Sequence, residues 1–378
     1  MDKYKQEYKR RVRDYLENYV PNYADFLKKR YKKYRYICGF GVGNMGSCIP
    51  EFVSALGRKL DFFCDNDVSK TGKKDPYGWG IDVISVGELE KFKNDTAILV
   101  PTRYYKDIYT QLKEEGFPLI DRIFLNKIWI DKYLESHDTK VIIDNLCRVI
   151  DYLEDEESCR IITRLIQEWT RNEYTYGQLD DIYSVPQYFP KDIMEADEKE
   201  KFVDCGAYIG DIVPDFMKFE DGKFEKYYAF ELNKDNYNKL QREIIEKWPG
   251  DSEKFILENK GVSDGTETIW YSQNGEGSKM SDSGTVQGQV ISLDEYFGTE
   301  KGVSFIKMDI EGAEVQALSG ARRVISMQHP KLAICIYHKP EDVWEIPMII
   351  KEIYPKYKLY IRHHTDLFNE TVCYAKCI

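Results

Sequence analysis

The chain has 378 residues, of which 42% are hydrophobic and 31% are charged, proportions that are ordinary for a water-soluble globular protein of two or three domains. Its formal net charge of -11 at pH 7 argues against nucleic acid as the main partner, because phosphate backbones attract basic surfaces. No apolar stretch is long enough for a membrane span, and the nine cysteines lack metal-ligand spacing. We therefore expect a cytoplasmic protein with reduced thiols, and we leave open whether it forms a homo-oligomer.

Residues 1–34 are expected to be helical, and residues 35–125 alternate short apolar strands with helical segments, as in a small parallel α/β domain. The first strand of this domain runs into a GxGxxG pattern that consists of Gly41, Gly43 and Gly46. The second strand ends at Asp65. A strand, a glycine turn and a helix in this order can hold a nucleotide or a nucleotide sugar. The alternative is that the glycines only permit the tight turn between strand and helix.

Residues 126–190 are expected to form a helical connector, because apolar residues recur there at helical spacing in two runs separated by the acids of residues 155–157. The connector ends in a segment that two prolines keep extended, and this segment contains Gln187 and Tyr188. Either side chain could cover a cofactor, or the segment only packs against the next domain.

The rest of the chain is organised around residues 201–211, KFVDCGAYIGD. A short buried strand is followed by two glycines, Gly206 and Gly210, and then by a helical pattern. The next strand ends at Glu231, where an acid is placed to accept hydrogen bonds from both hydroxyls of a ribose. The loop also carries Asp204 and Asp211, which repel phosphate but suit the sulfonium and ammonium groups of S-adenosyl-L-methionine. This chemistry favours S-adenosylmethionine over NAD, and the alternative is a turn with incidental acids.

The strand expected at 255–259 is closed by residues 261–264. In a sheet of this kind, that corner flanks the adenine ring of the cofactor. We expect Val262 to pack on one face of the ring, and Ser263 or Asp264 to accept a hydrogen bond from the amino group.

A second informative stretch begins with a buried strand at 305–308, which ends at Asp309. Glu311 to Glu314 are expected to open a helix that runs to about Met327. The carboxyl end of the fourth strand of a doubly wound sheet faces the transferred group, so these acids are candidates for catalysis. His338 ends the following strand beside the same predicted pocket. The alternatives are that the glutamates only complement the helix dipole and that the histidine is structural.

Six stretches occur in the order that is typical of one family: DCGAYIGD, YAFELN, NKGVSDG, SLDEYF, IKMDIEGAEVQALSGA and RHHTD…NETVCYA. Over about residues 150–378 the chain resembles FkbM-type methyltransferases. The resemblance implies a class I fold and O-methylation of a sugar or polyketide hydroxyl. It also implies that Asp204, Gly206, Gly210 and Glu231 bind the cofactor and that residues 309–314 line the pocket. The chain departs from the family at Tyr208, where many members have asparagine. The N-terminal domain resembles those fused to bacterial carbohydrate-modifying enzymes.

We therefore predict an α/β protein with four parts: a helical segment (1–34), a Rossmann-like nucleotide-binding-type domain (35–125), a helical connector (126–190) and a class I methyltransferase domain (191–378). The predicted cofactor site consists of Asp204, Gly206, Ala207, Tyr208, Gly210, Asp211, Glu231, Leu232, Val262, Ser263 and Asp264. The predicted catalytic residues are Asp309, His338, Glu311 and Glu314.

The predicted reaction is S-adenosylmethionine-dependent O-methylation of a small-molecule or glycan acceptor, which includes nucleotide-linked sugars. Asp309 or His338 is the expected base. Glu311 or Glu314 would orient acceptor hydroxyls or help hold a divalent metal, although the sequence shows no metal-ligand set. The rival hypothesis is a nucleotide-sugar-binding or regulatory protein in which the methyltransferase-like domain is catalytically inert. An NAD-dependent oxidoreductase is a weaker third.

Overall fold

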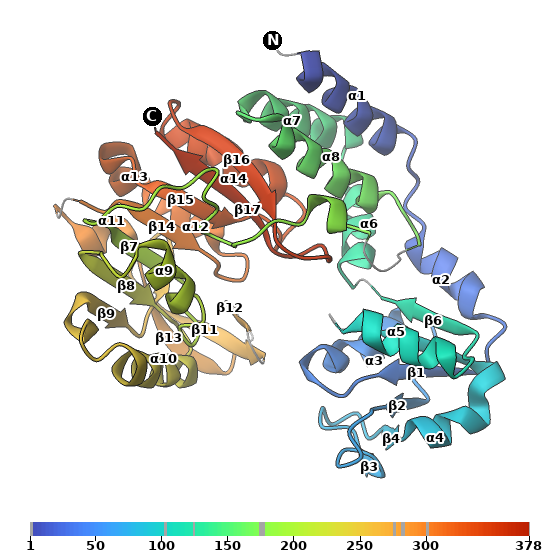
Figure 1. Ribbon diagram of the computed structural model, residues 1–378. Helices are drawn as coiled ribbons and strands as arrows, with labels where there is room; N and C mark the ends of the chain where they lie inside the picture. Colours follow the sequence, from blue (N-terminus) through green and yellow to red (C-terminus); the bar gives the residue numbers. More distant parts are fainter. Residues whose placement is uncertain are drawn as a thin grey trace. The chain divides into compact units, whose positions relative to one another are not determined.

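The computed structural model describes residues 3–101, 104–123, 125–173, 178–274, 277–280, 284–299 and 302–377 (Figure 1). The chain divides into two compact units. We call residues Arg13–Ile142 with Leu165–Asp181 the N-terminal unit, and Met1–Val12 with Ile143–Arg164 and Ile182–Ile378 the C-terminal unit. Within the described ranges, no helix combines the length and the apolar character that crossing a bilayer requires.

The N-terminal unit is built on a sheet in the order β3-β4-β2-β1-β5-β6, which is parallel except for β3. Its strands are β1 (Tyr36–Phe40), β2 (Phe62–Cys64), β3 (Lys73–Lys74), β4 (Asp82–Ile84), β5 (Thr96–Val100) and β6 (Leu119–Arg122). Its helices are α2 (Tyr23–Tyr31), α3 (Ile49–Ala55), α4 (Val86–Leu89), α5 (Tyr105–Glu114) and α6 (Leu125–Ser136), with the 3-10 turns η1 (Asn44–Cys48) and η2 (Glu90–Asp95). The expected Rossmann-like α/β arrangement is thus present.

Three further helices are α1 (Lys3–Glu17), α7 (Thr139–Tyr152) and α8 (Glu156–Trp169). The expected break between the two apolar runs of the connector falls directly before α8. The two compact units divide the connector between them, since α7 lies largely in the C-terminal unit while α8 ends in the N-terminal one. The predicted domain boundaries at residues 34, 125 and 190 stay predictions.

The C-terminal unit contains a seven-stranded sheet in the order β16-β17-β15-β14-β7-β8-β9. Its strands are β7 (Lys201–Cys205), β8 (Lys226–Phe230), β9 (Phe255–Glu258), β14 (Phe305–Met308), β15 (Lys331–Cys335), β16 (Lys358–His363) and β17 (Thr371–Lys376). Strands β7, β8, β9, β14 and β15 run parallel, and β17 inserts antiparallel between β15 and β16 (Figure 1). The last two strands of the chain thus form an antiparallel pair.

Helices cover both faces of this sheet because side chains alternate along each buried strand. Phe202 and Tyr227 point to the face that carries α9 (Val213–Phe219) and α10 (Lys234–Lys247). Tyr228 packs instead on Phe297 of α11 (Leu293–Phe297). The remaining helices are α12 (Glu314–Ser319), α13 (Arg322–Gln328) and α14 (Asp342–Ile353).

A smaller sheet in the order β10-β13-β11-β12 adjoins these elements. Its strands are β10 (Gly261–Val262), β11 (Glu267–Asn274), β12 (Gly277–Met280) and β13 (Val286–Ile291). The pairing of β10 with β13 is parallel, and it places Val262 opposite Ile291. This pairing fixes the backbone of the corner that was predicted to flank adenine.

The expectation of one helix from Glu311 to Met327 is wrong. Glu311 lies before the helix in the left-handed region, with φ 59°, and α12 begins only at Glu314. The helix is interrupted again at Gly320, where an added Cβ would lie 2.1 Å from the carbonyl oxygen of Ser263. The close approach of these two backbones separates α12 from α13, and no local sequence signal reports it.

Candidate active site

The loop after β7 is shaped by two glycines with positive φ, Gly206 at 82° and Gly210 at 85°. The backbone N–H groups of Gly206 and Ala207 both donate to the carbonyl oxygen of Phe230, at 3.0 Å. A Cβ on Gly206 would lie 2.0 Å from the carbonyl oxygen of Asp309. The loop therefore lies directly against the carboxyl end of β14, and only glycine permits this approach.

Glu231 lies buried where β8 ends, as predicted. Its Oε2 atom accepts from the backbone N–H of Tyr208 at 2.9 Å, and its Oε1 atom accepts from that of Asn233 at 2.7 Å. Burial raises the pKa of Glu231 to about 7, against the opposing effect of these N–H groups. A carboxylate has about four acceptor positions, so two remain for the hydroxyls of a ribose. The geometry suits the predicted role.

Asp204 is completely buried, its Oδ2 atom accepts from the hydroxyl of Tyr227 at 2.6 Å, and its Oδ1 atom pairs with Nζ of Lys307 at 3.0 Å. Lys307 also donates to the carbonyl oxygen of Gly206 at 2.8 Å, which links Asp204 to the loop backbone. Contact of Asp204 with a cofactor stays a prediction. Asp211 is the exposed acid of the loop.

The predicted adenine corner lies next to Glu231. Val262 and Ser263 are buried, and the hydroxyl of Ser263 donates to Asp264 at 3.3 Å. Leu232 adjoins this corner, because an added Cβ on Gly261 would lie 3.6 Å from its side chain. The structure thus brings the cofactor-binding candidates of three strand ends together, and their individual contacts with a cofactor stay predictions.

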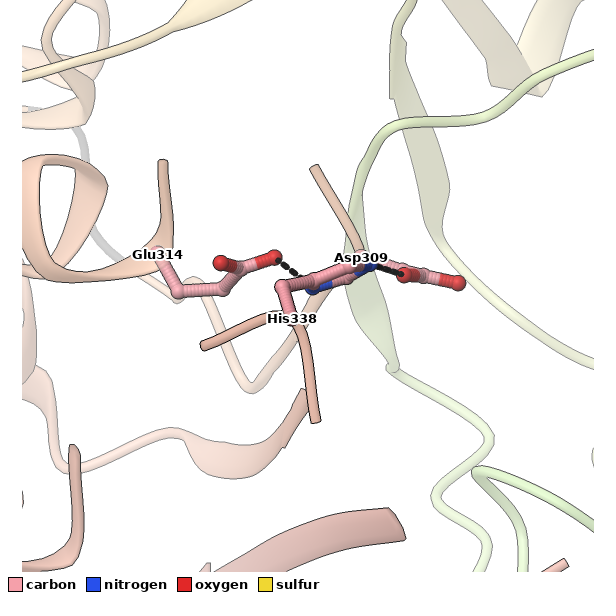
Figure 2. Close-up of side chains that lie close together, drawn as sticks. All are labelled: Asp309, Glu314 and His338. Carbon is pink, nitrogen blue, oxygen red and sulfur yellow. Dashed lines mark ion pairs between the residues drawn. The ribbon is translucent and has the colours of Figure 1, made fainter. Parts of the chain in front are cut away.

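The catalytic candidates form a cluster of two carboxylates around one imidazole (Figure 2). Asp309 follows β14, Glu314 is the first residue of α12, and His338 follows β15. The Nε2 atom of His338 lies 3.4 Å from Oδ1 of Asp309, and its Nδ1 atom lies 3.0 Å from Oε1 of Glu314. The carboxylate of Glu311 lies 3.9 Å from the same Nε2 atom. All four predicted catalytic residues are therefore neighbours.

The charges in this cluster shift two pKa values. Burial opposes the charged form of His338, but the carboxylates of Glu314, Asp309 and Glu311 outweigh it and raise the pKa to about 9. Burial also disfavours the carboxylate of Asp309, but Lys307 and His338 outweigh it and lower the pKa. Asp309 is accordingly an anion at neutral pH.

Three side chains contact this cluster in ways that the sequence did not predict, and of these only Tyr188 was named beforehand, as a residue that could cover a cofactor. Besides Lys307, the hydroxyl of Tyr188 donates to Oδ2 of Asp309 at 2.8 Å, and the hydroxyl of Tyr337 donates to Oδ1 at 3.0 Å. Tyr188 has φ 65°, a conformation that bulky residues seldom adopt. A lysine inside the otherwise apolar β14 was the one signal that could have been read.

The glycine loop of the N-terminal unit repeats the hydrogen bonds of the loop after β7. The N–H of Gly41 donates to Cys64 at 2.8 Å, and the N–H of Val42 donates to Oδ2 of Asp65 at 2.9 Å. Here, however, the hydroxyl of Tyr77 reaches into the loop and donates to the carbonyl oxygen of Gly43. A nucleotide at this loop stays a prediction.

Two protein-family models match the sequence. One is described as the methyltransferase FkbM domain and matches residues 204–365, and the other is described as a C-methyltransferase C-terminal domain and matches residues 1–117. The comparison with curated proteins found no match.

Among solved structures, a methyltransferase FkbM from Methylobacillus flagellatus KT has a TM-score of 0.73 at 21% identity, over 98% of this chain and 99% of that one. Fibrillarin from Aeropyrum pernix with natively bound S-adenosyl-L-methionine has a TM-score of 0.32 at 12% identity, over 49% and 70% of the two chains. A SAM-dependent methyltransferase from Aquifex aeolicus has 0.30 at 13%, over 50% and 87%. The likeness of fold rests on the first of these.

The family expected from the sequence is thus the family that is found. The matched region begins at Asp204 and extends past the cluster around His338, so it contains all the predicted cofactor and catalytic residues. The C-terminal part of the chain thus contains an FkbM-type S-adenosylmethionine-dependent methyltransferase domain, and a Rossmann-like α/β unit precedes it in the sequence.

Proposed function

We propose that this methyltransferase acts on a hydroxyl group of a sugar or glycan-related acceptor, which includes nucleotide-linked sugars. One observation carries the proposal: the loop that would hold the methyl donor lies against Asp309, whose carboxylate belongs to a cluster of acids, an imidazole and two tyrosine hydroxyls. A hydroxyl acceptor needs a group that takes its proton and groups that orient it, and such a cluster supplies both.

The residues around the loop after β7 fit S-adenosylmethionine. The remaining acceptor positions of Glu231 suit the ribose hydroxyls, and Asp211 is exposed where the ammonium group of the cofactor would lie. Gly206 and Gly210 let the loop pack closely against Asp309 and Leu240, which fixes its shape. The cofactor, when bound, supplies a methyl group already activated on a sulfonium, so the protein has to position the acceptor and manage one proton.

Asp309 and Glu311 are the members of the cluster that can touch the acceptor. Their side chains are 24% and 39% exposed, whereas those of His338 and Glu314 are 6% and 0% exposed. Of the two acids, Asp309 lies against the loop that would hold the methyl donor. The oxygen of a neutral alcohol becomes very acidic as it gains a methyl group, so even a carboxylate of low pKa can take the proton. His338 contacts Oδ1 of Asp309 and is itself contacted by Glu314, and the hydroxyl of Tyr188 donates to Oδ2 of Asp309.

The experiment is a methyl-transfer assay with S-adenosylmethionine radiolabelled in the methyl group, against separate panels of nucleotide sugars, free oligosaccharides, phenols and amines. We expect label in the sugar panels and an O-methyl ether by NMR of the product. Asp309→Asn should bind the cofactor like the wild type in calorimetry but lose about 100-fold in turnover. A methyl group found on carbon or nitrogen would refute the O-methylation proposal.

A second candidate function is binding of a nucleotide or nucleotide sugar by the N-terminal unit. The favouring observation is the repeated arrangement in which Asp65 accepts from the glycine loop as Glu231 does. Calorimetric titration with UDP-glucose and dTDP-glucose tests it, with Asp65→Asn as the variant. Binding that persists in Asp65→Asn, or no binding to the wild type at millimolar ligand, rejects the N-terminal site.

We propose a cytoplasmic location, which the nine free cysteines favour.

A further inference from the structure

The cluster around His338 has the composition of a cation site. Asp309, Glu314 and His338 each offer one ligand atom, and these atoms all lie within 4.8 Å of one another. They come from the ends of three elements, β14, α12 and β15, that the sheet brings to one edge (Figure 2). Oxygen and imidazole nitrogen together are donors for divalent ions of the first transition series.

Several buried polar atoms in the cluster have no hydrogen-bond partner among the described residues. These atoms are Oε2 of Glu314 and both ring nitrogens of His338, whose contacts with the carboxylates lack hydrogen-bond geometry. The side chain of Glu314 is fully buried and that of His338 is 6% exposed. Leaving such atoms unpaired costs about 1–3 kcal/mol each, so the cluster is incomplete as it stands.

The basic side chains near the cluster are mostly engaged elsewhere. Within the described ranges, neither Asp309 nor Glu314 forms an ion pair with a lysine or an arginine. Lys339 is close by, but its amine donates to the carbonyl oxygen of Gly312. Lys307 pairs with Asp204 and donates to the carbonyl oxygen of Gly206. Among the described residues, His338 is the basic side chain within ion-pair distance of Asp309 and Glu314.

We propose that Asp309, Glu311 and His338 bind a divalent transition-metal ion of the Mn²⁺ type, through Oδ1 of Asp309, a carboxylate oxygen of Glu311 and Nε2 of His338. Glu314 would then accept a hydrogen bond from Nδ1 of His338, the arrangement that orients most metal-binding histidines. Ligands at right angles around bonds of about 2.1 Å lie about 3 Å apart. The separations of 3.4 and 3.9 Å from Nε2 lie within about 1 Å of this spacing.

Glu311 is presented to this site by its backbone. Its φ of 59° and the φ of 96° at Gly312 turn the chain back before α12 begins. A Cβ on Gly312 would lie 3.6 Å from Cβ of His338, so this turn packs closely beside the imidazole. Strained backbone of this kind persists where surrounding structure enforces it, and it is concentrated at functional sites.

The inference deepens the proposed function and rests on it. A cation at the end of β14 would bind hydroxyl oxygens of the acceptor and lower their pKa, as bound metal ions do. The Oδ2 atom of Asp309, held by Tyr188, stays available for the proton. Neighbouring hydroxyls on one sugar ring offer two such oxygens, so the substrate class would be acceptors with adjacent hydroxyl groups.

The test is titration of the full-length protein, stripped of metal with EDTA and dialysed, with MnCl2 while free Mn²⁺ is followed by electron paramagnetic resonance. We expect one site of micromolar affinity, weakened at least 30-fold in Asp309→Asn and in His338→Gln. Glu352→Gln removes an exposed carboxylate elsewhere and should bind Mn²⁺ like the wild type. Calorimetry with S-adenosylmethionine verifies that each variant is folded.

Absence of Mn²⁺ binding to the wild type at millimolar concentration, or equal binding to His338→Gln, overturns the cation site. Full methyl transfer by the stripped protein in the presence of EDTA also overturns it, while the proposed function stands. If the protein with Mn²⁺ bound methylates no hydroxyl in any panel, the proposed function fails although the site exists.

Discussion

Replacing Lys307 by methionine should destabilise the C-terminal unit more than any change of a surface lysine. Its amine pairs with Asp204 at 3.0 Å and donates to the carbonyl oxygen of Gly206 at 2.8 Å, and the two side chains are 3% and 0% exposed. Methionine fills nearly the same volume, so the loss is electrostatic rather than a cavity. The change leaves Asp204 buried with the hydroxyl of Tyr227 as its remaining donor.

The magnitude follows from what the unpaired aspartate can do. Breaking a buried pair on one side costs about 3–5 kcal/mol. We therefore expect Lys307→Met to lower the free energy of unfolding by about 4 kcal/mol at pH 7. Asp204→Asn combined with Lys307→Met should recover about half of that loss.

The assay is urea unfolding that is monitored through hydrogen exchange of peptides from β7 and β14, because a global signal would mix the two compact units. For an m-value of about 2.5 kcal/mol/M, the midpoint should fall by about 1.5 M. Lys226→Met is the matched control, because that amine donates to the backbone carbonyl oxygen of Glu253 at the surface. This change should alter the free energy of unfolding by less than about 0.5 kcal/mol. A loss below about 1 kcal/mol at pH 7, or a double variant no more stable than Lys307→Met, would refute the reasoning.

Three further predictions concern the cofactor loop and a distant carboxyl pair. Glu231→Gln should weaken S-adenosylmethionine binding about 10- to 100-fold in calorimetry, because an amide group would face backbone N–H donors; unchanged affinity would remove Glu231 from the site. Gly206→Ala should lower the free energy of unfolding by about 1–3 kcal/mol and weaken cofactor binding, because its Cβ would clash with the carbonyl oxygen of Asp309. A melting temperature equal to that of the wild type would contradict this. Burial and Glu200 raise the pKa of Glu220 to about 8. The stability this proton provides is fully present below about pH 4.5 and is lost as pH rises through 8, so Glu220→Gln should flatten the melting-temperature profile over that range and be more stable than the wild type at pH 9.

The fold could be predicted because its signals are local. Each of β7, β8 and β14 is a short, mostly apolar run with an acid at or just after its carboxyl end, and Gly206 and Gly312 follow β7 and β14 closely. Such signals lie within ten residues of sequence. The residues that end parallel strands must meet at one edge of the sheet. That is why Glu231, Asp309 and His338, chosen from three separate stretches, lie around one site.

What the sequence could not reveal depends on which strands become neighbours. Asp204 and Lys307 are partners only because β7 pairs with β14 in a register that places them opposite each other, across about a hundred residues of chain. Asp204 was accordingly predicted as a cofactor ligand without its partner Lys307. Tyr188 was named as a residue that could cover a cofactor, but its contact with Asp309 was not predicted, since it joins segments 121 residues apart.

The two glycine loops show how one scaffold can have two chemical outcomes. In each loop a glycine at positive φ donates to the residue before an acid, and the acid then accepts from the loop backbone. In the C-terminal unit, Glu231 keeps acceptor positions for a ligand. In the N-terminal unit, the hydroxyl of Tyr77 contacts Gly43 and would lie 2.5 Å from a Cβ on Gly46, so it occupies space within the loop. A nucleotide at the N-terminal loop would have to displace Tyr77. The loop after β7 lies beside Asp309, and this difference assigns methyl transfer to the C-terminal unit.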